Sequence, residues 1–224
     1  MKTLLLNGSP KRGASDTLIL ANAFLDGMGA EFERVDVIGQ KIAPCLGCFS
    51  CWQKTPGVCA IRDDAGPLLE RIVRAELVVW SMPLYCYGMP SHVKALVDRL
   101  LPLATPRQYV DAEGRTHHPA RHDSRARHLL ISGSGFPDYE GNFDGLVFQF
   151  RRLFGADAPA ILCAETPLLN IPEAREATLP LLGAVRRAGA EFAQAGGISE
   201  ETMAQTRVPM IEPDLYRRIC SGEA

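Results

Sequence analysis

The sequence predicts an α/β fold, in which one doubly wound sheet of five mostly parallel strands carries helices on both faces. Short apolar runs alternate with segments of helical periodicity along most of the chain. Glycines, prolines and hydroxyl side chains gather in the segments that follow several of these runs. Because the carboxyl ends of parallel strands meet at one edge of such a sheet, we expect ligands to bind at that edge.

The apolar runs are expected to form the strands. The first is bounded by glycine and proline, which is typical of a strand buried on both faces, and the second alternates in period two. The expected strands are Thr3–Asn7, Glu31–Val37, Glu76–Met82, Arg127–Ser132 and Pro159–Ala164.

Apolar residues at helical spacing lie between and after these strands. Asp63 and Asp64 suit a helix start because carboxylates are stabilised at the positive end of the helix dipole. Pro180 is expected to kink or split the last long helix, since proline lacks the backbone N–H. The expected helices are Asp16–Gly27, Asp63–Arg74, His92–Leu101, Leu146–Phe154 and Pro172–Gln194.

The composition fits one globular domain with extensions: 46% of the 224 residues are apolar and 22% are charged. We expect a main domain over residues 1–197, with a cysteine-rich loop at 43–60 and a long basic loop at 102–125. The extension 198–224 carries too much apolar surface to stay free. It is expected to pack on its own domain or on a partner subunit, which predicts a homo-oligomer, a dimer or tetramer.

The charge balance excludes several classes of partner. The net charge is −2, from 24 basic and 26 acidic residues, so no overall field favours nucleic acid or anionic lipid. The longest apolar runs are too short to cross a bilayer, and the apolar stretch at the amino terminus is too short for an export signal. We therefore expect a cytoplasmic protein, in which clustered thiols indicate metal, cluster or redox sites.

The segment Gly8–Thr17 follows the first strand and precedes the first helix, and it is predicted to bind a phosphate. It lacks the Walker ending and the GxGxxG fingerprint, but it combines hydroxyls, cations and the free N–H groups of a helix start. A simple capping turn, with Ser15 or Asp16 as the cap, would explain only one of the hydroxyls. The expected phosphate contacts are Ser9, Lys11, Arg12, Ser15 and Thr17.

Three segments in this order carry a resemblance to a known family. The phosphate segment, Ser81–Pro90 and the run Lys94…Asp98-Arg99 together resemble the NAD(P)H-dependent FMN reductases of the flavodoxin-like fold, over roughly residues 1–165. The resemblance implies strand order 2-1-3-4-5, bound FMN and NAD(P)H as cosubstrate. The residues it places around the flavin ring are Met82, Pro83, Leu84, Tyr85, Gly88, Ser132, Gly133, Ser134 and Gly135.

The ring segment also has a physical logic, because a flat amphipathic ring needs apolar or aromatic faces and nearby backbone groups. The other interpretation is a plain strand-to-helix connection with buried aromatic residues. Asp16 departs from the family pattern, since a carboxylate beside a phosphate is unfavourable unless it points away or pairs with Lys11 or Arg12. We expect no essential side-chain base, because hydride transfer is the chemistry of the cofactor.

The implied function is an FMN-dependent oxidoreductase. NAD(P)H would reduce the flavin, which would pass electrons to a quinone, a nitro or azo compound, or free flavin. A rival hypothesis is an iron–sulfur flavoprotein that carries electrons from a ferredoxin-like donor. A redox sensor without turnover is a third hypothesis.

Four cysteines lie in one short segment with the spacing C-x2-C-x2-C-x7-C: Cys45, Cys48, Cys51 and Cys59. The segment resembles that of iron–sulfur flavoproteins, which implies a [4Fe-4S] cluster held by these thiolates. Zinc, a redox disulfide and a segment free of metal are the alternatives, because four thiolates also suit zinc and buried cysteine also acts as a small apolar residue.

The basic loop is rich in arginine and histidine. Its residues are either solvated or overhang the flavin and meet the phosphates of the dinucleotide or an acidic substrate. A metal site formed by His117, His118 and His122 is a further interpretation, but no carboxylate or thiol lies at a spacing that would complete it. The residues of the loop and of the strand after it are Arg107, Arg115, His117, His118, Arg121, His122, Arg125, Arg127 and His128.

Overall fold

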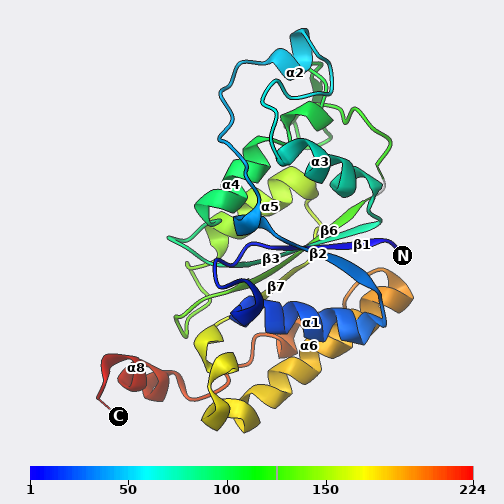
Figure 1. Ribbon diagram of the computed structural model, residues 1–224. Helices are drawn as coiled ribbons and strands as arrows, with labels where there is room; N and C mark the ends of the chain where they lie inside the picture. Colours follow the sequence, from blue (N-terminus) through cyan, green and yellow to red (C-terminus); the bar gives the residue numbers. More distant parts are fainter. Residues whose placement is uncertain (125, 224) are drawn as a thin grey trace.

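The computed structural model describes residues 1–124 and 126–223, and it contains one five-stranded parallel sheet (Figure 1). The strand order is β2-β1-β3-β6-β7, which confirms the predicted doubly wound α/β fold and its order 2-1-3-4-5. The strands are β1 (Thr3–Asn7), β2 (Phe32–Asp36), β3 (Leu77–Pro83), β6 (Arg127–Gly133) and β7 (Ala160–Cys163).

The sheet has one apolar core on each face, because alternate residues of each buried strand point to opposite sides. In β3, Trp80 packs in the core on the side of α3, α4 and α5, whereas Val79 packs with α1 and α6. Figure 1 shows these two layers of helices on either side of the sheet. The helices are α1 (Asp16–Met28), α3 (Ala65–Arg74), α4 (Ser91–Asp98), α5 (Asp144–Phe154) and α6 (Arg175–Ala195).

Helices α1 and α6 cross with almost no space between their backbones. A Cβ atom on Gly189 would lie 1.9 Å from the carbonyl oxygen of Phe24, and one on Gly27 would lie 1.9 Å from that of Arg186. Both positions therefore require glycine. This close crossing holds α1, and with it the phosphate segment at its amino end, against the rest of the domain.

Two details of regular structure differ from the expectations. Helix α6 is not split at Pro180: this residue is exposed, and the carbonyl that it leaves unbonded can bind water. The basic loop is not wholly irregular, since β4 (Tyr109–Val110) and β5 (Thr116–His117) form a small antiparallel hairpin around a turn at Gly114. Arg125 of this loop lies outside the described residues.

The C-terminal extension contains α7 (Glu200–Gln205) and α8 (Pro213–Ser221). It contacts its own domain: the buried Tyr216 donates a hydrogen bond to the carbonyl of Gly135 at 2.9 Å. Met203 and Met210 pack against the core on the α1–α6 side. Across the described residues, no helix combines the length and the apolar character that crossing a bilayer requires.

Candidate functional site at the carboxyl edge of the sheet

The segments that follow β1, β3 and β6 meet at the carboxyl edge of the sheet, as predicted from parallel topology. The N–H of Gly8 donates to the carbonyl of Ser81 at 2.7 Å, which ties the first segment to the end of β3. The N–H of Leu84 donates to the carbonyl of Gly133 at 2.8 Å, which ties the second segment to the third. Residues far apart in the sequence therefore form one rim.

Asn7 organises the phosphate segment, a role that the sequence analysis missed. Its fully buried side chain accepts a hydrogen bond from the N–H of Ser9 at 3.2 Å and donates to the carbonyl of Arg12 at 3.1 Å. It also donates to Asp36 Oδ1 on β2 at 2.8 Å. A polar residue at the end of an otherwise apolar strand was the signal, since a buried amide needs partners of this kind.

The three predicted hydroxyls are buried in this segment. Ser15 is the N-cap of α1: its Oγ accepts from the N–H of Leu18 at 3.2 Å and lies 3.0 Å from Thr17 Oγ1. Ser9 Oγ accepts from the N–H of Lys11 at 3.3 Å. In the described part of the chain, the N–H groups of Gly13, Asp16 and Thr17 donate to no protein acceptor. These open N–H groups at a helix start favour an anion.

The charged residues of the segment are arranged so that Asp16 does not oppose such an anion. Its Oδ2 lies 2.9 Å from Lys11 Nζ, and its Oδ1 accepts a hydrogen bond from the amide of Asn170. Lys11 is therefore engaged by a carboxylate, which leaves it less free to hold a phosphate than the sequence analysis expected. Arg12, at φ 51, has no carboxylate partner among the described residues.

The ring segment after β3 is a tight turn of defined shape. Tyr85 and Gly88 exchange two backbone hydrogen bonds, at 3.1 and 2.9 Å, and the residues between them have positive φ: 46° at Cys86 and 62° at Tyr87. Left-handed backbone at two non-glycine residues costs about 1–3 kcal/mol each. The turn leaves the aromatic rings of Tyr85 and Tyr87 exposed at the edge of the sheet.

The third segment is packed tightly. A Cβ atom on Gly133 would lie 2.2 Å from Thr166 Cγ2, and Thr166 Oγ1 donates to the carbonyl of Ser134 at 2.9 Å. Ser132 Oγ is buried and has no hydrogen-bond partner in the structure. A buried hydroxyl without a partner is uncommon, so Ser132 Oγ is free to form a hydrogen bond with a ligand at the rim.

Glu165, two residues after the end of β7, is a second residue at this edge that the sequence analysis missed. It is fully buried, has φ 55, and accepts a hydrogen bond from the N–H of Met210 at 2.8 Å. Burial raises the pKa of this carboxyl group, and its Oε1 has no partner in the structure. Together with the Tyr216–Gly135 hydrogen bond, Glu165 fastens the C-terminal extension to the rim.

The four thiols of the cysteine segment line one small cavity, although the segment contains a short helix, α2 (Ser50–Gln53), that the sequence analysis did not predict. Burial, with the charge of Cys59, Cys45 and Cys48 nearby, raises the pKa of the Cys51 thiol. Hydrogen bonds from Ser50 lower the pKa of the exposed Cys48 thiol. Within the described residues, no three His, Cys, Asp or Glu side chains are placed to hold a metal ion.

Arg99, at the end of α4, joins the two ends of the cysteine segment. Its guanidinium forms two hydrogen bonds with the carboxylate of Asp63, at 2.8 and 2.9 Å, and donates to the carbonyls of Ala43 at 2.8 Å and Ile61 at 3.3 Å. Burial opposes the charge of Asp63, but the hydrogen bonds with Arg99 and with backbone N–H groups prevail and lower its pKa. Arg99 Nε is buried without a partner, and Arg99 lines the same cavity as the thiols.

The histidines of the basic loop have different partners. His117 lies 2.7 Å from Asp111 Oδ2, whereas His118 contacts the carbonyl of Arg107 and the ring of Trp52. His118 and His122 line one cavity, but no third metal-binding side chain among the described residues is placed with them. The described residues therefore do not bring these three side chains together as a metal site.

Comparison with known proteins supports a common family. An iron-sulfur flavoprotein of Methanocaldococcus jannaschii is 31% identical over 105 residues, which is 46% of this chain and 53% of that protein. One of Archaeoglobus fulgidus is 34% identical over 104 residues, 46% of each chain. The chain therefore matches only about half the length of these curated relatives.

Solved structures share the fold. An FMN-dependent NADH-azoreductase of Bacillus anthracis, solved with FMN, superposes with a TM-score of 0.60 at 18% identity over 86% of this chain and 99% of that one. A NAD(P)H:quinone oxidoreductase of Methanothermobacter marburgensis gives 0.56 at 17% identity, over 85% and 95% of the two chains. Residues 1–137 match the family model for NADPH-dependent FMN reductases, which covers more than half of the sequence and includes all three rim segments. The chain belongs to the NADPH-dependent FMN reductase family.

Proposed function

We propose that this protein binds FMN at the carboxyl edge of the sheet and uses it to pass electrons from a pyridine nucleotide to a small-molecule acceptor. The observation that carries this proposal is the single rim formed by the three segments after β1, β3 and β6. At one end of the rim, open N–H groups at the start of α1 suit a phosphate. At the other, an exposed aromatic turn suits a flat ring.

Different residues of the rim would bind the phosphate and the ring of FMN. The N–H groups of Gly13, Asp16 and Thr17, the buried hydroxyl of Ser15 and the guanidinium of Arg12 would hold the phosphate. The turn Tyr85–Gly88 would lie against the ring, with Ser132–Gly135 at its far edge. Bound flavin supplies the hydride and electron chemistry. The protein orients the ring and leaves one face of it accessible to a second ligand.

The purified protein tests this directly. We expect it to be yellow, with the absorption bands of oxidised flavin, and to bleach when NADPH or NADH is added without oxygen. Protein that is colourless and binds no added FMN would contradict the proposal.

A pair of capping serines gives a matched control. Ser15 Oγ caps α1 through the N–H of Leu18 at 3.2 Å, and Ser199 Oγ caps α7 through the N–H of Thr202 at 3.2 Å. Replacing either by alanine should cost about 1 kcal/mol of stability. Only Ser15→Ala should also weaken FMN binding, by about 10- to 100-fold, because a hydrogen bond to a charged group contributes about 1.5–3 kcal/mol. Equal FMN affinities in the two variants would argue against a phosphate at Ser15.

The acceptor and the assembly are finer proposals. The open rim favours a flat acceptor such as a quinone, a nitro or azo compound, or flavin, and comparing turnover with each class would rank them. We propose a homo-oligomer in the cytoplasm, and light scattering of the purified protein measures the oligomeric state.

A second candidate function is electron transfer through an iron–sulfur centre. The favouring observation is that the four cysteines and the cationic Arg99 line one small cavity, since thiolate-bound clusters are anionic. No three of the described thiols are placed to hold a metal ion, so the segment would have to rearrange around a cluster. The relatives named as iron-sulfur flavoproteins agree with this candidate. Iron and sulfide analysis of protein prepared without oxygen decides it: about four of each per chain supports a cluster, and none refutes it.

A further inference from the structure

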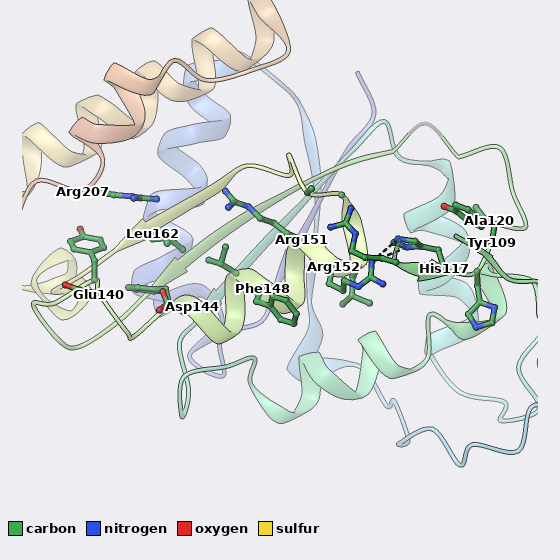
Figure 2. Close-up of a pocket in the computed structure, with 18 residues that line it drawn as sticks. Tyr109, His117, Ala120, Glu140, Asp144, Phe148, Arg151, Arg152, Leu162 and Arg207 are labelled. Atoms are coloured by element: carbon green, nitrogen blue, oxygen red, sulfur yellow. Dashed lines mark hydrogen bonds between the residues drawn. The ribbon is translucent and has the colours of Figure 1, made fainter. Parts of the chain in front are cut away.

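A second groove lies beside the rim. It has a volume of about 980 Å³ and runs along α5, between the β4–β5 hairpin and the segment that follows α7 (Figure 2). This volume lies within the range of small-molecule sites. Aromatic side chains, among them Tyr109, Phe143 and Phe148, line it, and Phe148 is 73% exposed. An aromatic ligand could therefore stack there without displacing any packed side chain.

One end of this groove adjoins the turn that we assign to the flavin ring. A Cβ atom on Gly145, in the first turn of α5, would lie 3.2 Å from the carbonyl oxygen of Tyr87. The neighbouring Asp144 lines the groove, and so does Gly155 just beyond the other end of the helix. The 11 residues of α5 span about 16 Å. A ligand that reaches the ring and fills the groove must be elongated.

The charges of the groove differ along its length. In Figure 2, Glu140, Asp144 and Arg207 lie at one end of the view, Arg151 lies in the middle and Arg152 lies toward His117. Arginines in the last turn of α5 are also favoured by the helix dipole. That effect cannot explain Arg207, which comes from the segment after α7. Cations from two separate elements therefore line one groove.

The contacts of these arginines also favour the binding of an anion. Arg152 donates to the carbonyl of Thr116 at 3.0 Å and lies 3.3 Å from His117 Nδ1, while His117 Nε2 lies 2.7 Å from Asp111 Oδ2. Arg151 uses its Nε for the carbonyl of Ala158 at 3.4 Å, and its two Nη groups have no protein acceptor in the described structure. Arg207 likewise has no carboxylate partner among the described residues.

We propose that this groove binds the phosphorylated adenosine half of NADPH, a step that rests on the proposed function. The pyrophosphate faces Arg207, the adenine ring lies on Phe148, and the 2′-phosphate faces Arg151 and Arg152. The nicotinamide end of the nucleotide then lies beside Asp144, toward the turn Tyr85–Gly88 that we assign to the flavin ring. NADH lacks the 2′-phosphate, which carries up to two negative charges, so the groove favours NADPH over NADH.

Steady-state kinetics of two variants test the assignment. Arg151→Gln should raise the KM for NADPH about tenfold or more and leave the KM for NADH within about twofold, since it removes a charge-assisted hydrogen bond to the 2′-phosphate alone. Arg207→Gln should raise the KM for both nucleotides, because both contain the pyrophosphate. Arg74→Gln is the control: this exposed arginine pairs with Glu70 outside the groove and should change neither KM.

Binding of adenosine 2′,5′-bisphosphate, measured by calorimetry on the flavin-loaded protein, gives a second readout. It should bind more tightly than adenosine 5′-monophosphate, and Arg151→Gln should abolish the difference. Equal effects of Arg151→Gln on NADPH and NADH, or equal affinity for the two adenosine phosphates, would overturn the assignment. If neither NADPH nor NADH bleaches the flavin, the proposed function fails, and the calorimetry still decides whether the groove binds the 2′-phosphate.

Discussion

The buried ion pair between Arg99 and Asp63 should be costly to break, because both side chains are largely hidden from solvent. The side chains are 1% and 11% exposed, and Arg99 satisfies the Asp63 carboxylate and two backbone carbonyls, those of Ala43 and Ile61. Arg99→Met keeps most of the side-chain volume but leaves these acceptors without their donor. Breaking a buried pair by removing one partner costs about 3–5 kcal/mol, mainly through the carboxylate left behind.

An exposed ion pair provides the matched comparison. Arg71 lies 2.6 Å from Glu33, but the side chains are 34% and 62% exposed. Arg71→Met should therefore cost only about 0–1 kcal/mol, because solvent screens the pair. Urea unfolding measures both changes against the 5–15 kcal/mol that is typical for a whole domain, so the first variant should lose a large share of the total stability.

The damage from Arg99→Met should also be local. Arg99 joins Ala43 to Ile61 and Asp63, so its loss should free the cysteine segment before the sheet unfolds. Limited proteolysis should cut the variant between residues 43 and 61 much faster than the parent protein. The reasoning is refuted if Arg99→Met unfolds within about 1 kcal/mol of the parent and is cleaved there no faster.

Three further predictions follow from packing and titration. Gly189→Ala should lower the stability of the fold by about 3 kcal/mol or more, because the new Cβ would lie 1.9 Å from the carbonyl oxygen of Phe24. Gly183→Ala, in the same helix with no atom within 4 Å of the new Cβ, should raise the stability measured by thermal unfolding by about 1 kcal/mol. Burial lowers the pKa of His128 to about 4, so the unfolded chain binds more protons and stability should fall as pH drops from about 6.5 to 4. His128→Gln should flatten that decline in a series of Tm measurements, and an unchanged slope would count against the assignment. The pKa of the Asp63 carboxyl is lowered in the folded protein, so this group should stabilise the fold at pH values above its pKa in the unfolded chain and lose that contribution in more acidic solution. The difference in unfolding free energy between the parent protein and Arg99→Met should therefore become smaller as the pH is lowered.

Local sequence decided the positions of the strands and of the phosphate segment. The run Thr3–Asn7 is apolar without interruption, and Ser15 followed by α1 is a strong capping signal, so both could be assigned without knowledge of the neighbours. The strand order came from the resemblance to a family, and the structure confirms it. The flavin contacts of the rim residues stay a prediction.

Only the tertiary structure showed which side chains are buried between these elements and where grooves form. Nothing near Glu165 in sequence indicates that it is buried and bound by Met210, 45 residues away. The groove along α5 likewise depends on Arg207 meeting Arg151 across separate elements. Periodicity and capping act over a few residues and can be seen in the chain, whereas burial, ion pairing and cavity shape depend on which elements pack together.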